Sequence, residues 1–235
     1  MQLIDQIDTA LRAAGTPGRA EREKAYLKSG LEHYGTRVPA IRSAAKAAAS
    51  QHPDLSHDDL VKLVAALWAA PVHERRVAAV ELLDIYHKRL RSQDIVFIER
   101  VLREAHTWAL VDPLAATVVG RLAVRNPELG RVLDRWAEDH DFWIRRASLL
   151  ALLVPLRRGA GDFDRFGKYA DALLGDKEFF VRKAIGWVLR DTAKKRPDLV
   201  FAWLLPRASR ASGVTIREAI KPLTDSQRGA IIAAR

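Results

Sequence analysis

The sequence of 235 residues contains no cysteine. This absence excludes disulfide bonds, zinc sites with thiolate ligands and a thiol nucleophile. It is also compatible with a reducing compartment, where disulfides are rare. We therefore expect a cytoplasmic protein whose chemistry does not depend on a thiol.

Long hydrophobic runs are also missing. No apolar stretch approaches the roughly 18 residues that a membrane-spanning helix needs. The first residues, MQLIDQIDTALRAAG, carry acidic side chains early and lack a long apolar core, so we do not expect a signal peptide. A composition of 49% hydrophobic and 29% charged residues is typical of a folded globular chain.

Several well-defined motifs of enzymes are absent. The chain has no GxxxxGK[ST] phosphate loop, no GxGxxG after a strand and no GxSxG elbow. The seven histidines show no HExxH and no other cluster with the spacing of metal ligands. Single histidines are usually surface or capping residues. The sequence therefore predicts neither a nucleotide-binding loop nor a metal centre.

Patterns of alternating polar and apolar residues, which indicate strands, are not convincing anywhere in the chain. The apolar spacing is helical instead, and the breaks are short, as at Thr16-Pro17-Gly18, Asn126-Pro127 and Arg196-Pro197. No low-complexity linker divides the chain, so we predict one all-α domain over residues 1–235. The expected helices are 3–14, 19–29, 39–50, 56–68, one between Pro71 and Lys88, 93–104, 107–124, 127–138, 141–156, 162–174, 178–196, 198–205, 214–221 and 225–233.

The helices repeat. DFWIRRASLLALL, from Asp141, matches EFFVRKAIGWVLR, from Glu178, at an offset of 37 residues, and HERRVAAVELL from His73 lies about two such periods earlier. A helical repeat of this length predicts a HEAT-like solenoid, a curved superhelix in which stacked helix pairs bury their apolar faces. Cations at corresponding positions should then form a basic strip along a concave groove. These cations are Arg75, Arg76, Arg145, Arg146, Arg182 and Lys183.

The net charge is strongly positive. A formal charge of +10 and a pI near 10.1 favour an anionic partner, and nucleic acid is the leading candidate. A curved basic groove suits a DNA duplex, whose phosphates attract clustered lysine and arginine. The alternative is a surface that is merely basic.

The segment Glu178–Arg196 is predicted to be a two-faced helix. At about 100° per residue, one face is apolar and the other is basic with one tryptophan at its centre. A tryptophan among cations suits a polyanion that carries sugars and bases. The alternative is a half-buried tryptophan beneath a solvated basic face. The inward face holds Val181, Ala184, Ile185, Val188 and Thr192, and the outward stripe holds Lys183, Trp187, Arg190 and Lys194.

Trp108 and Asp112 are four residues apart in HTWALVD, so they share one face of a helical turn. This stretch resembles the tryptophan-to-aspartate segment of the AlkD family of DNA alkylation-repair glycosylases. Three further blocks are similar to that family, and together they cover most of the chain. They are EREKAYLKSGLEHYGTRVPAIR (21–42), FWIRRASLLALL (142–153) and KEFFVRKAIGWVLRDTAKKRPDLV (177–200).

The resemblance implies a function. Members of the family are HEAT-like solenoids that excise positively charged N3- and N7-alkylated purines from double-stranded DNA. They hold the duplex in the concave groove and do not bury a flipped base. The resemblance thus implies a monomeric, monofunctional glycosylase that needs no metal or cofactor and that lies on the nucleoid when bound to DNA.

The resemblance also assigns residues. It implies that Trp108, Asp112 and Trp187 surround the deoxyribose and backbone of the lesion, and that Arg146 contacts a nearby phosphate. The other DNA-binding candidates are Arg145, Lys183, Arg190, Lys194 and Tyr26. Tyr26 and Tyr34 are candidates for contact with the DNA backbone, or else half-buried packing residues. Trp68, Trp136 and Trp203 are assigned to packing between helices.

The expected chemistry centres on Asp112. A cationic purine is already an activated leaving group, so a carboxylate near C1′ is enough to stabilise the positive charge that grows on the sugar. The alternative is structural, because Asp112-Pro113 is typical of an N-cap followed by the first residue of a helix. Two other functions stay open: a non-catalytic DNA-binding protein and a scaffold for protein interaction.

Overall fold

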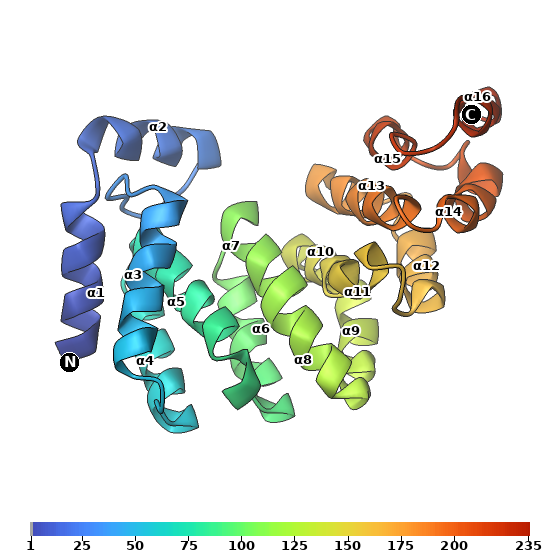
Figure 1. Cartoon of the computed structure of the whole chain (residues 1–235). Helices are drawn as coiled ribbons and strands as arrows, with labels where there is room; N and C mark the ends of the chain where they lie inside the picture. Colours follow the sequence, from blue (N-terminus) through green and yellow to red (C-terminus); the bar gives the residue numbers. More distant parts are fainter. Residues whose placement is uncertain (1) are drawn as a thin grey trace. The chain divides into compact units, whose positions relative to one another are not determined.

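The computed structural model describes residues 2–235, which are helical almost throughout (Figure 1). Within this range there is no strand, and β-type pairing is limited to one isolated bridge between Glu32 and Val72. The prediction of an all-α fold is confirmed. None of the helices in residues 2–235 combines the length and the apolar character needed to span a lipid bilayer.

The Cα positions group into two compact units, Met1–Leu114 and Ala115–Arg235. No loop separates them, because α7 (Trp108–Pro113) is followed directly by a π-helix, Leu114–Val119, and then by α8 (Gly120–Arg125). The prediction of a single domain over the whole chain stays a prediction.

The first unit is built around the contact of α5 with its neighbours. Helices α3 and α4 both pack on α5, and α1 packs on α3. The apolar side chains between them are almost wholly buried, for example Leu60, Leu67 and Leu82, and burial of this kind is the main stabilising contribution to the unit. Its helices are α1 (Gln2–Ala13), α2 (Pro17–Leu27), α3 (Val38–Gln51), α4 (His57–Ala69), α5 (His73–Ile85), α6 (Ile95–Arg103) and α7.

The second unit is organised around α13, which packs on α10, α11, α14 and α15. Its most extensive packing is with α15, and Gly186 permits a close contact there: a Cβ at this position would lie 2.8 Å from both the Thr215 carbonyl oxygen and the Glu218 Cβ. Its further helices are α9 (Gly130–Ala137), α10 (Phe142–Leu150), α11 (Leu153–Arg157), α12 (Phe163–Ala172), α13 (Phe179–Ala193), α14 (Pro197–Leu204), α15 (Gly213–Ala219) and α16 (Asp225–Ala233).

Most predicted helices are present, and the differences have local causes. The helix expected over 141–156 divides into α10 and α11. Pro155 has no N–H to donate to the carbonyl of Ala151, so the regular ladder is interrupted there. The carbonyl oxygen of Ala151 instead faces Gly120, and a Cβ at Gly120 would lie 2.8 Å from this oxygen. The helix expected to reach Lys88 ends at Ile85, before a 3₁₀ turn over His87–Arg89.

Candidate functional site

Helix α7 carries the first pair of predicted site residues, and Thr107 begins it. Thr107 has extended backbone angles, and its side chain accepts a hydrogen bond from the backbone N–H of Ala109. Asp112 therefore lies inside the helix, one turn after Trp108. The alternative that Asp112 caps a helix beginning at Pro113 is wrong, because Thr107 is the cap.

Pro113 also lies within α7, although proline disfavours helical geometry in the residue before it. Its ring nitrogen cannot donate to the carbonyl of Ala109, so one hydrogen bond of the α-helical ladder is lost. The chain continues as the π-helix Leu114–Val119. Short π segments recur at functional sites because they change which side chains share a face. The irregularity of the helix thus falls immediately after the candidate carboxylate.

Trp108 and Asp112 are both half-buried, and they lie on the same side of α7. The structure adds Tyr26 to them, since its ring meets the Trp108 ring edge to face with centroids 6.2 Å apart and planes at 89°. Tyr26 is 74% exposed. The first unit therefore presents two adjacent aromatic rings and a carboxylate at its surface. Trp108 is not a fully buried core residue.

Tyr34 has a different environment. It is buried, its hydroxyl donates to Asp8 Oδ1 at 2.8 Å, and the Arg12 guanidinium carbon lies 4.2 Å from its ring centroid. Burial, reinforced by the hydrogen bond with Asp8, raises the pKa of Tyr34 to about 12. The structure therefore gives Tyr34 a packing role in the first unit, and a contact of Tyr34 with the DNA backbone stays a prediction.

In the second unit, α13 has the two faces that the sequence predicts. The inward face is wholly buried, and it consists of Val181, Ala184, Ile185, Val188 and Thr192. On the outward stripe Lys183 and Lys194 are exposed, whereas Trp187 and Arg190 are half-buried. Arg190 also pairs with Glu218 of α15. The stripe therefore offers positive charge and an aromatic ring together, but part of its charge is already paired within the protein.

Asp191 organises this stripe, and sequence reasoning missed it. Its side chain is buried, and Oδ2 accepts hydrogen bonds from Trp187 Nε1 at 3.1 Å and Arg157 Nε at 2.8 Å. Lys194 Nζ donates to Oδ1 at 2.8 Å. Burial by itself would raise the pKa of Asp191, but the hydrogen bonds from Lys194 and Arg157 lower it overall, so the carboxylate is ionised. Its position four residues after Trp187 was the available signal.

Arg145 and Arg146 have partners inside the protein. Arg146 is only 2% exposed, donates to the carbonyl of Phe180 and lies over the Phe180 ring, with its guanidinium carbon 5.8 Å from the centroid. Arg145 Nε pairs with Asp176 Oδ2 at 2.7 Å. A phosphate contact from Arg146 stays a prediction, and the structure gives this side chain a packing role within the second unit.

The repeated cations have a common local role. Arg76, Arg145 and Arg182 each lie in the first turns of a helix and donate to a backbone carbonyl of the segment before it: Arg145 and Arg182 to the preceding connection, and Arg76 to Trp68 in the last turn of α4. An arginine at this place fixes the approach of the chain to its helix, because its several N–H groups reach more than one acceptor. Of the six cations predicted to form a basic strip, Lys183 alone is exposed, and the other five are half-buried or buried.

A possible metal-binding group also occurs in the first unit, away from any spacing visible in the sequence. One atom each from Glu23, His33 and Glu74 lies within 4.8 Å of the others. These residues come from three separate segments: α2, the connection after it, and α5.

Comparison with known proteins places this geometry in context. A sequence model of the family described as DNA alkylation repair enzyme matches residues 7–223, a range that runs through both units. No curated protein sequence matches the chain.

Solved structures show the same fold. A structure described as a predicted DNA alkylation repair enzyme from Enterococcus faecalis is similar at a TM-score of 0.81 and 21% identity, over 90% of this chain and 97% of that one. AlkD2 from Streptococcus mutans is similar at a TM-score of 0.62 and 20% identity, over 87% of this chain and 99% of that one. The protein smu.31 from Streptococcus mutans UA159 has the same TM-score of 0.62 at 18% identity, over 87% and 98%. The prediction of a HEAT-like helical-repeat fold is confirmed.

Proposed function

The chain belongs to the DNA alkylation repair enzyme family, and from this premise we propose that it is a monofunctional DNA glycosylase. The proposed substrate is double-stranded DNA that contains a positively charged purine alkylated at N3 or N7. The reaction is hydrolysis of the N-glycosidic bond, without insertion of the base into a deep pocket.

One observation carries the proposal: Asp112 lies inside α7, next to an aromatic surface, and Thr107 supplies the cap. Asp112 is half-buried, so water screens its charge less than at an open surface. Trp108 on the same face supplies a flat apolar surface, and Tyr26 extends it.

The mechanism follows from the charge of the substrate. As the bond from C1′ to the purine breaks, the electron pair leaves with the base, which becomes neutral, and positive charge develops on the sugar. The Asp112 carboxylate stabilises this oxocarbenium ion and orients a water molecule toward C1′. The water oxygen forms the new bond and releases its proton through Asp112 to solvent. Trp108 restricts bulk water, which strengthens the electrostatic interaction.

Residues of the second unit are proposed to serve the same duplex. Trp187 contacts the sugar face of the lesion, and its hydrogen bond with Asp191 holds the indole in a fixed orientation. Lys183 and Lys194 are exposed and contact phosphates directly. Arg145, Arg146 and Arg190 contribute positive charge near the DNA while they keep their internal partners. The protein is proposed to act as a monomer in the cytoplasm, on DNA of the nucleoid.

The test is release of 7-methylguanine from methylated duplex DNA. The wild type should release it, and Asp112→Asn should lower the rate by about 10²- to 10³-fold, the usual effect of losing a transition-state charge interaction. Asp164→Asn is the matched control, because Asp164 is an exposed acid of α12 in the second unit, outside the proposed site. The control should react like the wild type.

Other outcomes separate the alternatives. Equal release by the wild type and by Asp112→Asn would keep the glycosylase and remove Asp112 from its mechanism. No release by either protein, with tight and salt-sensitive DNA binding, would favour a non-catalytic DNA-binding protein. Weak binding that is insensitive to salt would favour a scaffold for protein interaction.

A further inference from the structure

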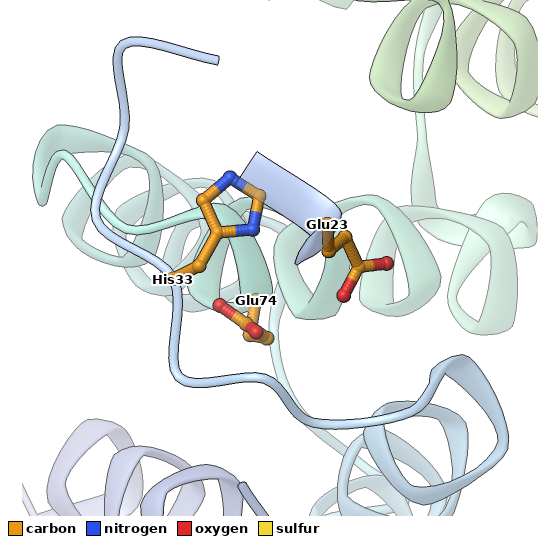
Figure 2. Close-up of side chains that lie close together, drawn as sticks. All are labelled: Glu23, His33 and Glu74. Atoms are coloured by element: carbon orange, nitrogen blue, oxygen red, sulfur yellow. The ribbon is translucent and has the colours of Figure 1, made fainter. Parts of the chain in front are cut away.

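Three polar side chains from separate segments of the first unit lie close together. Glu23 comes from α2, His33 from the connection between α2 and α3, and Glu74 from the first turn of α5. One ligand atom of each lies within 4.8 Å of the other two. Figure 2 shows the imidazole of His33 close to both carboxylates.

The imidazole of His33 is buried and makes no hydrogen bond with the part of the chain that the structure describes. Its exposed fraction is 9%, and neither Nδ1 nor Nε2 has a partner within residues 2–235. The ring of His73 stacks on it, with centroids 4.6 Å apart and planes at 9°, so the plane of the imidazole is fixed. Buried polar atoms in native proteins are nearly always satisfied. An imidazole whose two nitrogens are both buried and unsatisfied therefore points to a ligand-binding site.

Glu23 also has a buried polar atom that lacks a hydrogen-bond partner in the described part of the chain. Its Oε1 accepts from Arg19 at 3.3 Å, whereas its Oε2 is buried without a hydrogen-bond partner in the described part of the chain. An ionised carboxylate has several lone pairs, and leaving them unused in a buried site is costly. Two of the three side chains thus have coordinating atoms that the protein itself does not use.

Glu74 is held rigidly by the backbone. Its Oε1 accepts from the N–H groups of Gly35 at 2.7 Å and Thr36 at 3.1 Å, and its Oε2 accepts from the N–H of Tyr34 at 3.0 Å. Each carboxylate oxygen has two lone pairs, so Oε2 keeps one for a further bond. A carboxylate that is oriented by hydrogen bonds of this kind is typical of a metal ligand.

We propose that Glu23, His33 and Glu74 bind one divalent transition-metal ion. A nitrogen ligand together with two carboxylates suits Zn²⁺, which accepts both types and is usually four-coordinate, so that water fills the remaining position. The nitrogen ligand disfavours Mg²⁺ and Ca²⁺, which prefer oxygen alone. This proposal departs from the expectation of a metal-free protein, and it stands independently of the glycosylase activity.

The ion has a structural role in this position. Helix α2 buries none of its side chains, so apolar packing holds it weakly. A metal bond through Glu23 fastens α2 to the connection that follows it and to α5. Tyr26 lies one turn further along α2, where it meets Trp108. The ion therefore keeps Tyr26 next to Trp108.

The test is titration of the full chain with ZnCl₂ after treatment with a chelator, followed by calorimetry. The wild type should bind one Zn²⁺ per chain and should melt at a higher temperature with zinc than without it. His33→Phe removes the ligand nitrogen but keeps an aromatic ring for His73 to stack on. Glu23→Gln keeps the shape of the side chain and removes its charge. Each variant should weaken zinc binding by at least about tenfold.

His140→Gln is the matched control, because the side chain of His140 is 92% exposed and belongs to the second unit. It should bind zinc like the wild type. Unchanged binding in both His33→Phe and Glu23→Gln would overturn the proposal, as would equally tight binding of Mg²⁺. If His33→Phe does not fold, Glu23→Gln decides alone, since Glu23 lies at the partly exposed edge of the group.

Discussion

The indole of Trp187 donates a hydrogen bond to the carboxylate of Asp191, which also accepts hydrogen bonds from Arg157 and Lys194. Asp191 is buried, whereas the side chains of Arg157 and Lys194 are 45% and 57% exposed. The two cations can regain water if the acid is lost, but the indole cannot regain its fixed orientation. A single buried charge thus determines where a surface aromatic ring lies.

We therefore expect Asp191→Ala to have two effects. It should lower the free energy of unfolding by about 1–3 kcal/mol, because buried hydrogen bonds to a charged group are lost. It should also reduce release of 7-methylguanine, because Trp187 becomes free to rotate. Urea denaturation and the release assay measure the two effects. Trp187→Phe keeps an aromatic ring and the ionised Asp191 but removes the indole N–H. Unchanged activity in Asp191→Ala, together with low activity in Trp187→Phe, would contradict the proposal that Asp191 positions Trp187.

At the scale of elements, α13 and α15 approach each other at a glycine. Gly186→Ala places a methyl group 2.8 Å from the backbone oxygen of Thr215, so the helices must separate. We expect a loss of about 1–3 kcal/mol in the free energy of unfolding. Gly229→Ala is the matched control, because nothing lies within 4 Å of a Cβ at that position of α16. It should be neutral or stabilise by up to about 1 kcal/mol. Equal stability of the two variants in urea would disprove the steric argument.

The start of α4 contains a pH-dependent contact. Hydrogen bonds with Asp58 and Asp94 raise the pKa of His57 above its usual value of 6.5, while burial and Arg91 oppose the shift. Protonated His57 therefore stabilises the folded state fully below pH 6.5, and this contribution is lost as the pH rises through the higher folded pKa.

We expect the wild type to lose up to about 1 kcal/mol of stability through this contact between pH 6 and pH 8.5. His57→Gln should lose less over the same range, since glutamine does not titrate. Urea midpoints of both proteins at the two pH values measure the difference. Parallel pH profiles for the two proteins would show that His57 contributes nothing.

At the scale of the whole molecule, the net charge of +10 should dominate association with DNA. Affinity for a duplex should fall by at least about 100-fold between 50 and 200 mM salt, since bound phosphates release counterions. Lys183→Gln should reduce the slope of log affinity against log salt by about one, if this exposed lysine contacts a phosphate. Fluorescence anisotropy measures both slopes. An unchanged slope in Lys183→Gln would remove that contact.

The sequence predicted those features that depend on local spacing. The two faces of α13 and the shared face of Trp108 and Asp112 follow from helical periodicity alone. The sequence left open whether Asp112 caps a helix that begins at Pro113, and the folded chain decides this, because Thr107 caps α7 and Asp112 lies inside it. The pairing of Tyr26 with Trp108 joins residues 82 positions apart in the numbering, and no local pattern encodes such a contact. The same reason hid His33, whose neighbours come from two other segments.

Glu74 accepts hydrogen bonds from three consecutive amides, those of Tyr34, Gly35 and Thr36, about 40 positions away in the chain. These amides belong to a connection that forms no helix. They become accessible to exchange only if their hydrogen bonds to the buried Glu74 carboxylate of α5 break. In hydrogen–deuterium exchange they should therefore exchange as slowly as the amides of α5 itself, whereas the amides of α2 should exchange early. A segment without helical hydrogen bonds would then be among the last parts of its unit to open.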